Sequence, residues 1–191
     1  MKSIPFVMLS LLLSLGTFVY AQNDMQAMST PQPAPSEAQK SFTEMKTLAG
    51  TWHGQVTINP PMQGMENTTM EVLMHVTSRG NALVHEMKEA GKQDDPTKND
   101  HPVTMFYLDN DKLTLVHYCD AGNRPRMAAR TSPDGKTVEF DFLDVSGSTK
   151  YGHMQHAVFT VVDANHHIED WTFLMPGDKP MHARMDLTRV Q

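Results

Sequence analysis

The segment 117–127 carries the most reactive combination of side chains in the chain. His117 and Cys119 are two residues apart in an alternating pattern, so both are expected to face the same side of a strand. Arg124 and Arg126 follow a turn-like loop, and a guanidinium can hold a carboxylate through two charge-assisted hydrogen bonds. The pattern predicts a polar rim that binds the head of a ligand. The alternative is a turn whose arginines only pair with acidic residues on neighbouring strands.

A second histidine, His85, falls on the apolar phase of its own strand. His85 and His117 are therefore candidates for a buried polar pair that orients a ligand. Together with His153 or His156 they could instead bind haem, copper or zinc, because imidazole is a common ligand of these metals. The alternative for each of them is a core histidine whose ring is hydrogen-bonded within the protein.

The position of Cys119 near a histidine raises the question of nucleophilic catalysis. That chemistry needs a thiol of low pKa, a base and a third group that orients the base. The chain has no Gly-x-Ser-x-Gly elbow, no His-Glu-x-x-His helix and no Cys-x-x-Cys pair. We therefore predict no catalytic residue, and an inert buried thiol is the default interpretation of Cys119.

Methionine is abundant, with 16 residues, and several stand next to a histidine. Thioether and imidazole groups together suit Cu(I). The run of His-x-Met motifs that would favour copper is absent, however, and the methionines fall on apolar strand positions. Methionine fills irregular interiors and adapts to varied ligands, so these residues are interpreted as core or pocket lining.

A sheet is needed to position these side chains, and from Trp52 onward apolar and polar residues alternate with period two. Trp52, Gly54, Val56 and Ile58 share one face of the first strand, and turn signals such as the segment 132–135 separate later strands. About ten short strands with almost no helix predict an all-β fold. Hairpin-like links from end to end favour an antiparallel up-and-down β-barrel, and a barrel of this size can enclose one small ligand.

One short N-terminal helix is expected before the first strand. Ser36 has the character of an N-cap, and Phe42, Met45 and Leu48 follow at helical spacing up to a glycine. We expect this helix to act as a plug or lid at one end of the barrel.

The opening of the first strand resembles that of lipocalin-like and nitrobindin-like barrels, in the Gly-x-Trp unit at Gly50-Thr51-Trp52. The segment 115–127 resembles a signature of secreted bacterial proteins in a lipocalin-like group of unknown function, as do the segments 147–153 and 169–173. The resemblance covers about Phe42 to Val190 and implies a calycin-type barrel, without implying a reaction.

The chain departs from the nitrobindin-like pattern at the histidine that would hold haem. His182 is the nearest positional candidate, but it alternates with Met181 and Ala183 and shares the phase of Arg184. We therefore expect His182 to point outward, which weighs against haem binding by that route.

The N-terminus has the three parts of a secretory signal peptide. Lys2 gives a positive start, the segment 4–19 is apolar but shorter than the ~20 residues of a membrane helix, and Val19-Tyr20-Ala21 offers a cleavage site. We expect an exported protein, periplasmic or secreted, with no membrane span after cleavage. The predicted divisions are a signal peptide at 1–21, a disordered linker at 22–36 and a lipocalin-like barrel domain at 37–191.

The charge and cysteine content narrow the classes of partner. The net charge of -6, with no cluster of basic residues, argues against a nucleic-acid partner, because phosphates require a basic face. The single cysteine cannot form an intrachain disulfide.

Three hypotheses follow. The first is an exported barrel that binds a small hydrophobic or amphipathic molecule, with histidine and arginine at its mouth. The second is a haem- or metal-binding barrel that uses interior histidines. The third is a filled structural barrel of the cell envelope. The predicted ligand-binding residues are His85, His117, Cys119, Asn123, Arg124, Arg126, Met127 and Trp171.

Overall fold

The computed structural model of the chain describes residues 33–65, 67–93, 95 and 97–190. The signal peptide predicted at 1–21 and most of the linker predicted at 22–36 lie outside these residues. Across the residues that the structure describes, no helix is both long and apolar enough to span a membrane. The elements are α1 Glu37–Thr47, β1 Gly50–Asn59, β2 Thr69–Thr77, the 3-10 turn η1 Ser78–Gly80, β3 Ala82–Glu89, β4 Val103–Asp109, β5 Lys112–Tyr118, β6 Arg124–Thr131, β7 Thr137–Ser146, β8 His153–Asp163, β9 His166–Met175 and β10 Lys179–Arg189.

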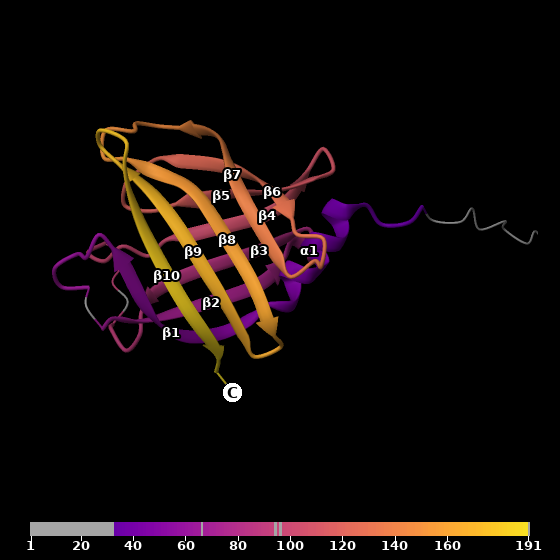
Figure 1. Cartoon of the computed structure of the whole chain (residues 1–191), viewed down its shortest axis with the longest axis horizontal. Helices are drawn as coiled ribbons and strands as arrows, with labels where there is room; N and C mark the ends of the chain where they lie inside the picture. The colour runs from indigo at the N-terminus through magenta and orange to yellow at the C-terminus, as the bar shows by residue number, and fades with distance from the viewer. Residues whose placement is uncertain (1–32, 66, 94, 96, 191) are drawn as a thin grey trace, which may run out of the picture. The chain divides into compact units, whose positions relative to one another are not determined.

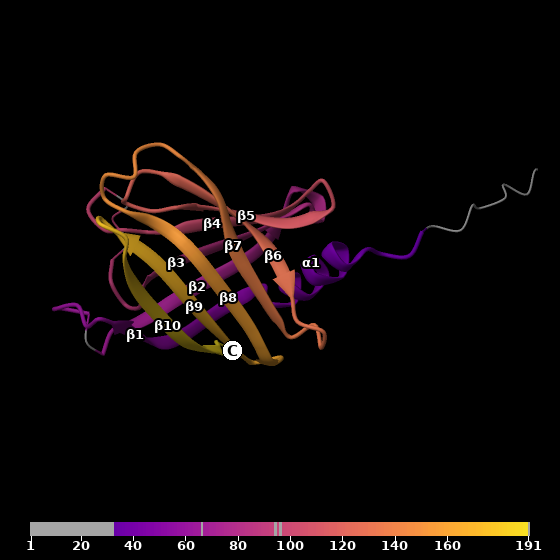
Figure 2. The ribbon, with the colours of Figure 1, turned by 45° about the horizontal axis from the view of Figure 1, so that its top comes forward.

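The ten strands form one closed antiparallel barrel in which each strand pairs with its neighbours in the sequence (Figures 1 and 2). The first and last strands close it, in a register that runs from Trp52 opposite Arg189 to Asn59 opposite His182. Closure leaves no unpaired strand edge within the barrel. The prediction of an all-β up-and-down barrel of about ten strands with one short N-terminal helix is confirmed.

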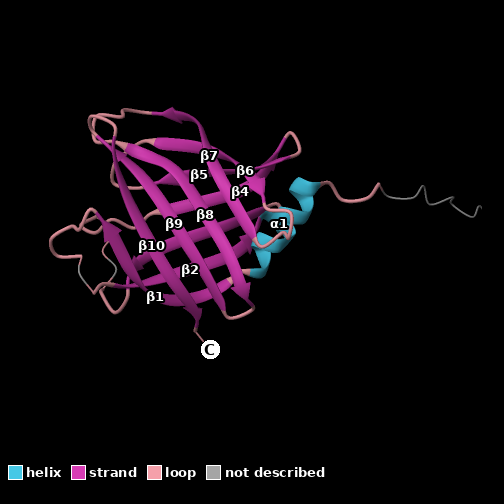
Figure 3. Ribbon diagram, in the orientation of Figure 1, coloured by secondary structure: helices cyan, strands magenta, loops and turns pink. Residues whose placement is uncertain are grey.

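The helix α1 packs against the barrel at one end, beside β4 and β5 (Figure 3). Ser36 caps it as predicted: its hydroxyl accepts a hydrogen bond from the backbone N–H of Gln39, whose side chain accepts one from the backbone of Ser36. Phe42, Met45 and Leu48 are buried in the core, which is the plug expected from their helical spacing.

Arg189 ties the end of β10 to the end of α1. Its guanidinium lies over the Trp52 ring, 4.0 Å from the ring centroid. It also donates hydrogen bonds to the carbonyl oxygens of Ala49 at 2.7 Å and Thr47 at 3.0 Å. Gly50 permits this approach, because its φ of 144° is a conformation that favours glycine and an added Cβ would lie 2.3 Å from Arg189 Nη1.

Inward-facing side chains fill the part of the barrel nearest α1. Trp52 lies between Arg189 and His167, whose ring meets it edge-on with centroids 4.2 Å apart. Phe106, Phe140 and Phe159 form an aromatic cluster in the same core, with ring centroids 5.3–5.9 Å apart. This packed layer leaves space for a ligand only toward the opposite end of the barrel.

The contribution of Arg189 can be compared with that of an exposed arginine on the same strand. We expect Arg189→Ala to lower the free energy of unfolding by about 2 kcal/mol, because the carbonyl oxygens of the α1 end and the Trp52 ring lose their cationic partner. The matched control is Arg184→Ala, which removes an exposed ion pair with Asp170 and should cost less than about 1 kcal/mol. Urea unfolding measures both, and equal losses would contradict this role of Arg189.

Candidate functional site

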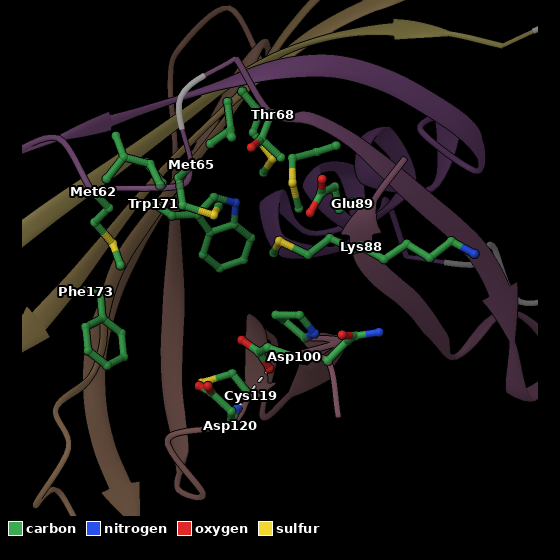
Figure 4. Close-up of a pocket in the computed structure, with 18 of the residues that line it drawn as sticks. Met62, Met65, Thr68, Lys88, Glu89, Asp100, Cys119, Asp120, Trp171 and Phe173 are labelled. Carbon is green, nitrogen blue, oxygen red and sulfur yellow. Dashed lines mark hydrogen bonds between the residues drawn. The ribbon is translucent and has the colours of Figure 1, made fainter. Parts of the chain in front are cut away.

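A cavity of about 900 Å³ lies in the barrel, lined by β1, β2, β3, β5, β8, β9 and β10 and by loops between strands. The contributing loops join β1 to β2, β3 to β4, β5 to β6 and β7 to β8, at the end of the barrel away from α1 (Figure 1). The helix therefore closes one end, and the cavity lies at the other. Figure 4 shows Trp171 and Phe173 on one side of this space and Asp100, Cys119 and Asp120 on another.

The wall of the cavity is mainly apolar and rich in sulfur. Trp171, Phe173, Val56 and Ile58 contribute aromatic and branched apolar groups. The methionines that line it are Met62, Met65, Met70, Met87, Met154, Met181 and Met185. Their flexible, polarisable side chains make a surface that adapts to the shape of a bound molecule, as the interpretation of the methionines as pocket lining requires.

His117, on β5, is a buried polar side chain that borders this cavity. Its Nδ1 lies 2.8 Å from the hydroxyl oxygen of Thr104, which is fully buried. Among the described residues this hydroxyl has no other partner, so its hydrogen points to Nδ1 and the ring hydrogen is on Nε2. Nε2 is buried and has no hydrogen-bonding partner among the described residues. His117 thus offers an unused N–H donor beside the cavity.

Burial, together with the charge of His85, lowers the pKa of His117 to about 3. The ring is therefore neutral around pH 7, because desolvation disfavours the charged imidazolium. A neutral donor in an apolar wall suits an uncharged acceptor, such as a carbonyl or ether oxygen, better than a carboxylate.

A buried carboxylate, Glu169, fixes the rings beneath the cavity. Its oxygens accept hydrogen bonds from His85 Nε2 at 3.0 Å, from His167 Nε2 at 3.0 Å and from Trp171 Nε1 at 2.9 Å. The side chains of Glu169, His85 and His167 are fully buried. Because Trp171 also lies against His117, with ring centroids 5.4 Å apart, this network positions the part of the cavity wall where the unused donor lies.

Two opposing effects act on the pKa of Glu169. Burial alone raises it, since a carboxylate is poorly solvated in the core. The charge of His85 and the hydrogen bonds from His167 and His85 outweigh burial and hold the pKa below its usual value. Glu169 therefore stays ionised in the folded protein.

Neither Glu169 nor His167 was among the residues predicted from the sequence. Trp171 was, and residues two and four positions before it share its face of the strand. Counting back in this way from Trp171 reaches Glu169 and then His167. The sequence therefore did contain a signal for this network: two ionisable residues on the strand face that Trp171 turns toward the interior.

The predicted residues separate into those that border the cavity and those that do not. His117, Cys119 and Trp171 line it, and His85 lies beneath it on Glu169. Both histidines face the interior, as their strand phase predicted. Met127 is fully buried in the core. It is not among the residues that line the cavity.

Arg124 and Arg126 lie on the outer surface of β6 rather than among the residues that line the cavity. The strand begins at Arg124, and its alternation turns Pro125 and Met127 inward and both arginines outward. Arg126 forms a bidentate pair with Asp144 on the neighbouring strand β7, and Arg124 donates to the Ser146 hydroxyl. For Arg126 this geometry matches the alternative in which an arginine pairs with an acidic residue on a neighbouring strand, whereas Arg124 bonds a serine.

Asn123 joins two neighbouring loops through its side-chain amide. It is buried, and its Nδ2 donates hydrogen bonds to the carbonyl oxygens of Ser148 at 2.9 Å and Gly152 at 2.7 Å. These bonds hold the β7–β8 loop against the β5–β6 loop beside the cavity.

The histidines considered for a metal site are not gathered in one place. His153 stacks on Phe142, with centroids 5.0 Å apart, whereas His156 contacts Glu139 on the outer face of the barrel at 2.9 Å. Within the described residues, the group that could hold a metal is Glu139, Asp141 and His156. Arg130 already pairs with both carboxylates of that group, so they have a cationic partner.

Cys119 lies at the rim of the cavity between Asp100 and Asp120 (Figure 4). The pKa of its thiol is raised, first by burial and then by these two carboxylates, although a hydrogen bond from the backbone of Ala121 acts in the opposite direction. The thiol is therefore protonated near pH 7, which disfavours nucleophilic attack.

Comparisons with known proteins give likenesses among solved structures alone. No family model and no curated protein matches the chain. Among solved structures, it is similar to a protein of unknown function from the DUF3598 family of Nostoc punctiforme PCC 73102, with 9% sequence identity and a TM-score of 0.40. The match covers 76% of this chain and 48% of the other, so the chain spans about half the length of that structure.

The importance of Glu169 can be tested by replacing its charge alone. We expect Glu169→Gln to lower the free energy of unfolding by about 3 kcal/mol, because an amide cannot accept all three hydrogen bonds and leaves His85 and His167 without a carboxylate. The control is Glu71→Gln on the half-exposed outer side of β2, which should cost less than about 1 kcal/mol. Urea unfolding followed by circular dichroism gives both values, and a Glu169→Gln protein as stable as the wild type would refute the proposed role.

The low pKa of His117 predicts a specific loss of stability in mild acid. The unfolded chain binds a proton below about pH 6.5, but the folded protein does not until about pH 3. Stability therefore falls between these values, by up to about 1.4 kcal/mol per pH unit for this group. The pKa of Glu169 is lowered in the folded protein, so its carboxylate stabilises the fold above pH 4.5, its usual pKa. This contribution to stability is lost as the pH falls below that value.

The measurement is the free energy of unfolding at pH 7, 6 and 5 in wild type and His117→Gln. The variant should show a shallower fall than the wild type between pH 6.5 and 5. His182→Gln, at an exposed position on β10, is the control and should keep the wild-type slope. Identical slopes in all three proteins would mean that His117 does not titrate as described.

Proposed function

We propose that this barrel binds one small, mainly apolar molecule in its cavity, and that His117 Nε2 donates a hydrogen bond to an acceptor on that molecule. The observation that carries the proposal is the buried, unpartnered Nε2 in a mainly apolar wall. A buried donor without a partner costs free energy, and a bound acceptor would remove that cost. The proposal includes export to the periplasm or the medium, on the basis of the signal-peptide pattern. It also includes membership of the lipocalin-like barrels, on the basis of the resemblance in sequence.

The size and chemistry of the cavity support a ligand rather than a filled interior. A volume of about 900 Å³ falls within the range of roughly 300–1,000 Å³ typical of small-molecule sites. Apolar walls with a few polar groups are also typical of such sites. An open space of this size weighs against the hypothesis of a filled structural barrel.

Haem is a second candidate ligand, because His117 is the kind of residue that could hold it. A haem-binding imidazole needs one ring nitrogen free to face the iron and a partner on the other, and His117 has an unpartnered Nε2 and Thr104 on Nδ1. In that state Nδ1 would carry the ring hydrogen and donate it to the Thr104 hydroxyl. His182 is exposed on β10 and hydrogen-bonds Thr172, so it is not placed for this role.

Binding of a neutral fluorescent probe, N-phenyl-1-naphthylamine, tests occupation of the cavity. We expect micromolar binding by the wild type and at least about tenfold weaker binding by Ala183→Phe, since Ala183 lines the cavity and a ring there would fill it. Ala164→Phe, in the exposed turn between β8 and β9, is the matched control and should bind as the wild type does. Equal binding by all three proteins would place the probe outside the cavity and contradict the proposal.

A parallel titration with haemin separates the two candidate ligands. Haem held by His117 should give a Soret band that is lost in His117→Phe. A wild type that binds the naphthylamine but gives no shifted Soret band favours the apolar ligand, and a Soret band that survives in His117→Phe rules out haem held by this residue.

A further inference from the structure

The rim of the cavity carries two carboxylates that no lysine or arginine of the described residues pairs with. Asp100 and Asp120 both line it, and the backbone N–H of Asp120 donates to Asp100 Oδ1 at 2.9 Å. Within the described part of the chain neither carboxylate forms an ion pair with a lysine or arginine. This contrasts with Asp144 and Asp170, which arginines hold on the outer face of the barrel.

The lysines at the same rim do not balance these charges, because each is engaged elsewhere. Two of their partners, Glu71 and Asp95, lie outside the lining of the cavity. The ion pairs are Lys88 with Glu71 at 3.2 Å, Lys92 with Glu89, and Lys98 with Asp95 at 2.8 Å. The uncompensated charge at the cavity entrance is therefore negative.

The two carboxylates also act on each other. The pKa of Asp100 is raised, first by burial and then by the charge of Asp120, while hydrogen bonds from the backbones of Asp120 and His101 and the charge of His101 lower it only in part. Their charges also raise the pKa of the Cys119 thiol between them. A positive charge at this point would relieve the repulsion between the carboxylates.

From these observations we infer that the ligand of the cavity is an amphipathic cation, with its positive group between Asp100 and Asp120 and its apolar body against Trp171. The inference rests on the proposed function and names its ligand class. His117 Nε2, buried and unpartnered beside the same cavity, supplies a donor for an acceptor farther along the ligand. Trp171 and Phe173 add aromatic surface, which also favours a cation or a flat ring. The chain as a whole carries a net charge of -6, which attracts cations over a longer range.

Three probes with the same naphthalene body and different charge test this inference: 1-naphthylmethylamine, 1-naphthalenemethanol and 1-naphthoate. We expect the cation to bind about tenfold more tightly than the neutral alcohol, and the anion to bind most weakly. Isothermal titration calorimetry gives the three dissociation constants. The preference for the cation should shrink when sodium chloride is raised to 0.5 M, because salt screens charges at an exposed rim.

The double variant Asp100→Asn/Asp120→Asn should lose the preference and bind the amine and the alcohol with similar affinity, since asparagine removes the charge but retains the oxygen that accepts from the Asp120 backbone. Asp178→Asn, in the exposed β9–β10 turn outside the cavity lining, is the control and should keep the preference. Binding of the alcohol or the anion as tightly as the amine, or a preference that survives in the double variant, would overturn the inference while leaving the cavity site intact. Failure of all three probes to bind would overturn the inference and the proposed function together.

Discussion

The interior of this barrel depends on one ion, the carboxylate of Glu169. A carboxylate that is fully removed from water is costly unless nearly all of its hydrogen-bonding capacity is used. Three N–H donors from three rings meet that requirement: His85, His167 and Trp171. Because each donor must point at the same two oxygens, the rings lose their freedom to rotate, and the aromatic layer across the barrel becomes fixed.

That fixed layer divides the barrel into a closed half and an open half. On one side, Trp52 packs against His167 and under Arg189, and α1 covers the end. On the other side, Trp171 meets His117, and both rings border the cavity. The same carboxylate thus serves stability on one side and the shape of the cavity on the other. In the proposed mode of binding, a ligand that enters the open end meets the rim charges of Asp100 and Asp120 first and the neutral donor of His117 deeper.

Much of the fold could be predicted because it depends on local pattern. Period-two alternation, turn residues and the Gly50-Thr51-Trp52 opening are each readable over a few positions, and they led to the barrel, the helical plug and the inward orientation of His85 and His117. The arginines were harder to place, because their direction depends on where β6 begins. One residue of shift in a strand reverses the face of every side chain.

The central network could not be found by pattern alone, since its partners are distant in the sequence. His85 and Glu169 are 84 positions apart and meet only because β3 and β9 face each other across the closed barrel. The cavity depends likewise on how loops from separate hairpins meet at one end, and no local signal encodes its volume. The rim charges have the same origin, since Asp100 and Asp120 come together through a contact between the β3–β4 loop and the β5–β6 loop.

A crystal structure of the protein soaked with 1-naphthalenemethanol would show whether the layer fixed by Glu169 supports a ligand-binding cavity. We expect the naphthalene ring in the cavity against Trp171, its hydroxyl oxygen within hydrogen-bonding distance of His117 Nε2, and Glu169 still bonded to its three donors. A cavity filled by the protein's own side chains, or a Glu169 carboxylate turned away from His85 and Trp171, would contradict this expectation.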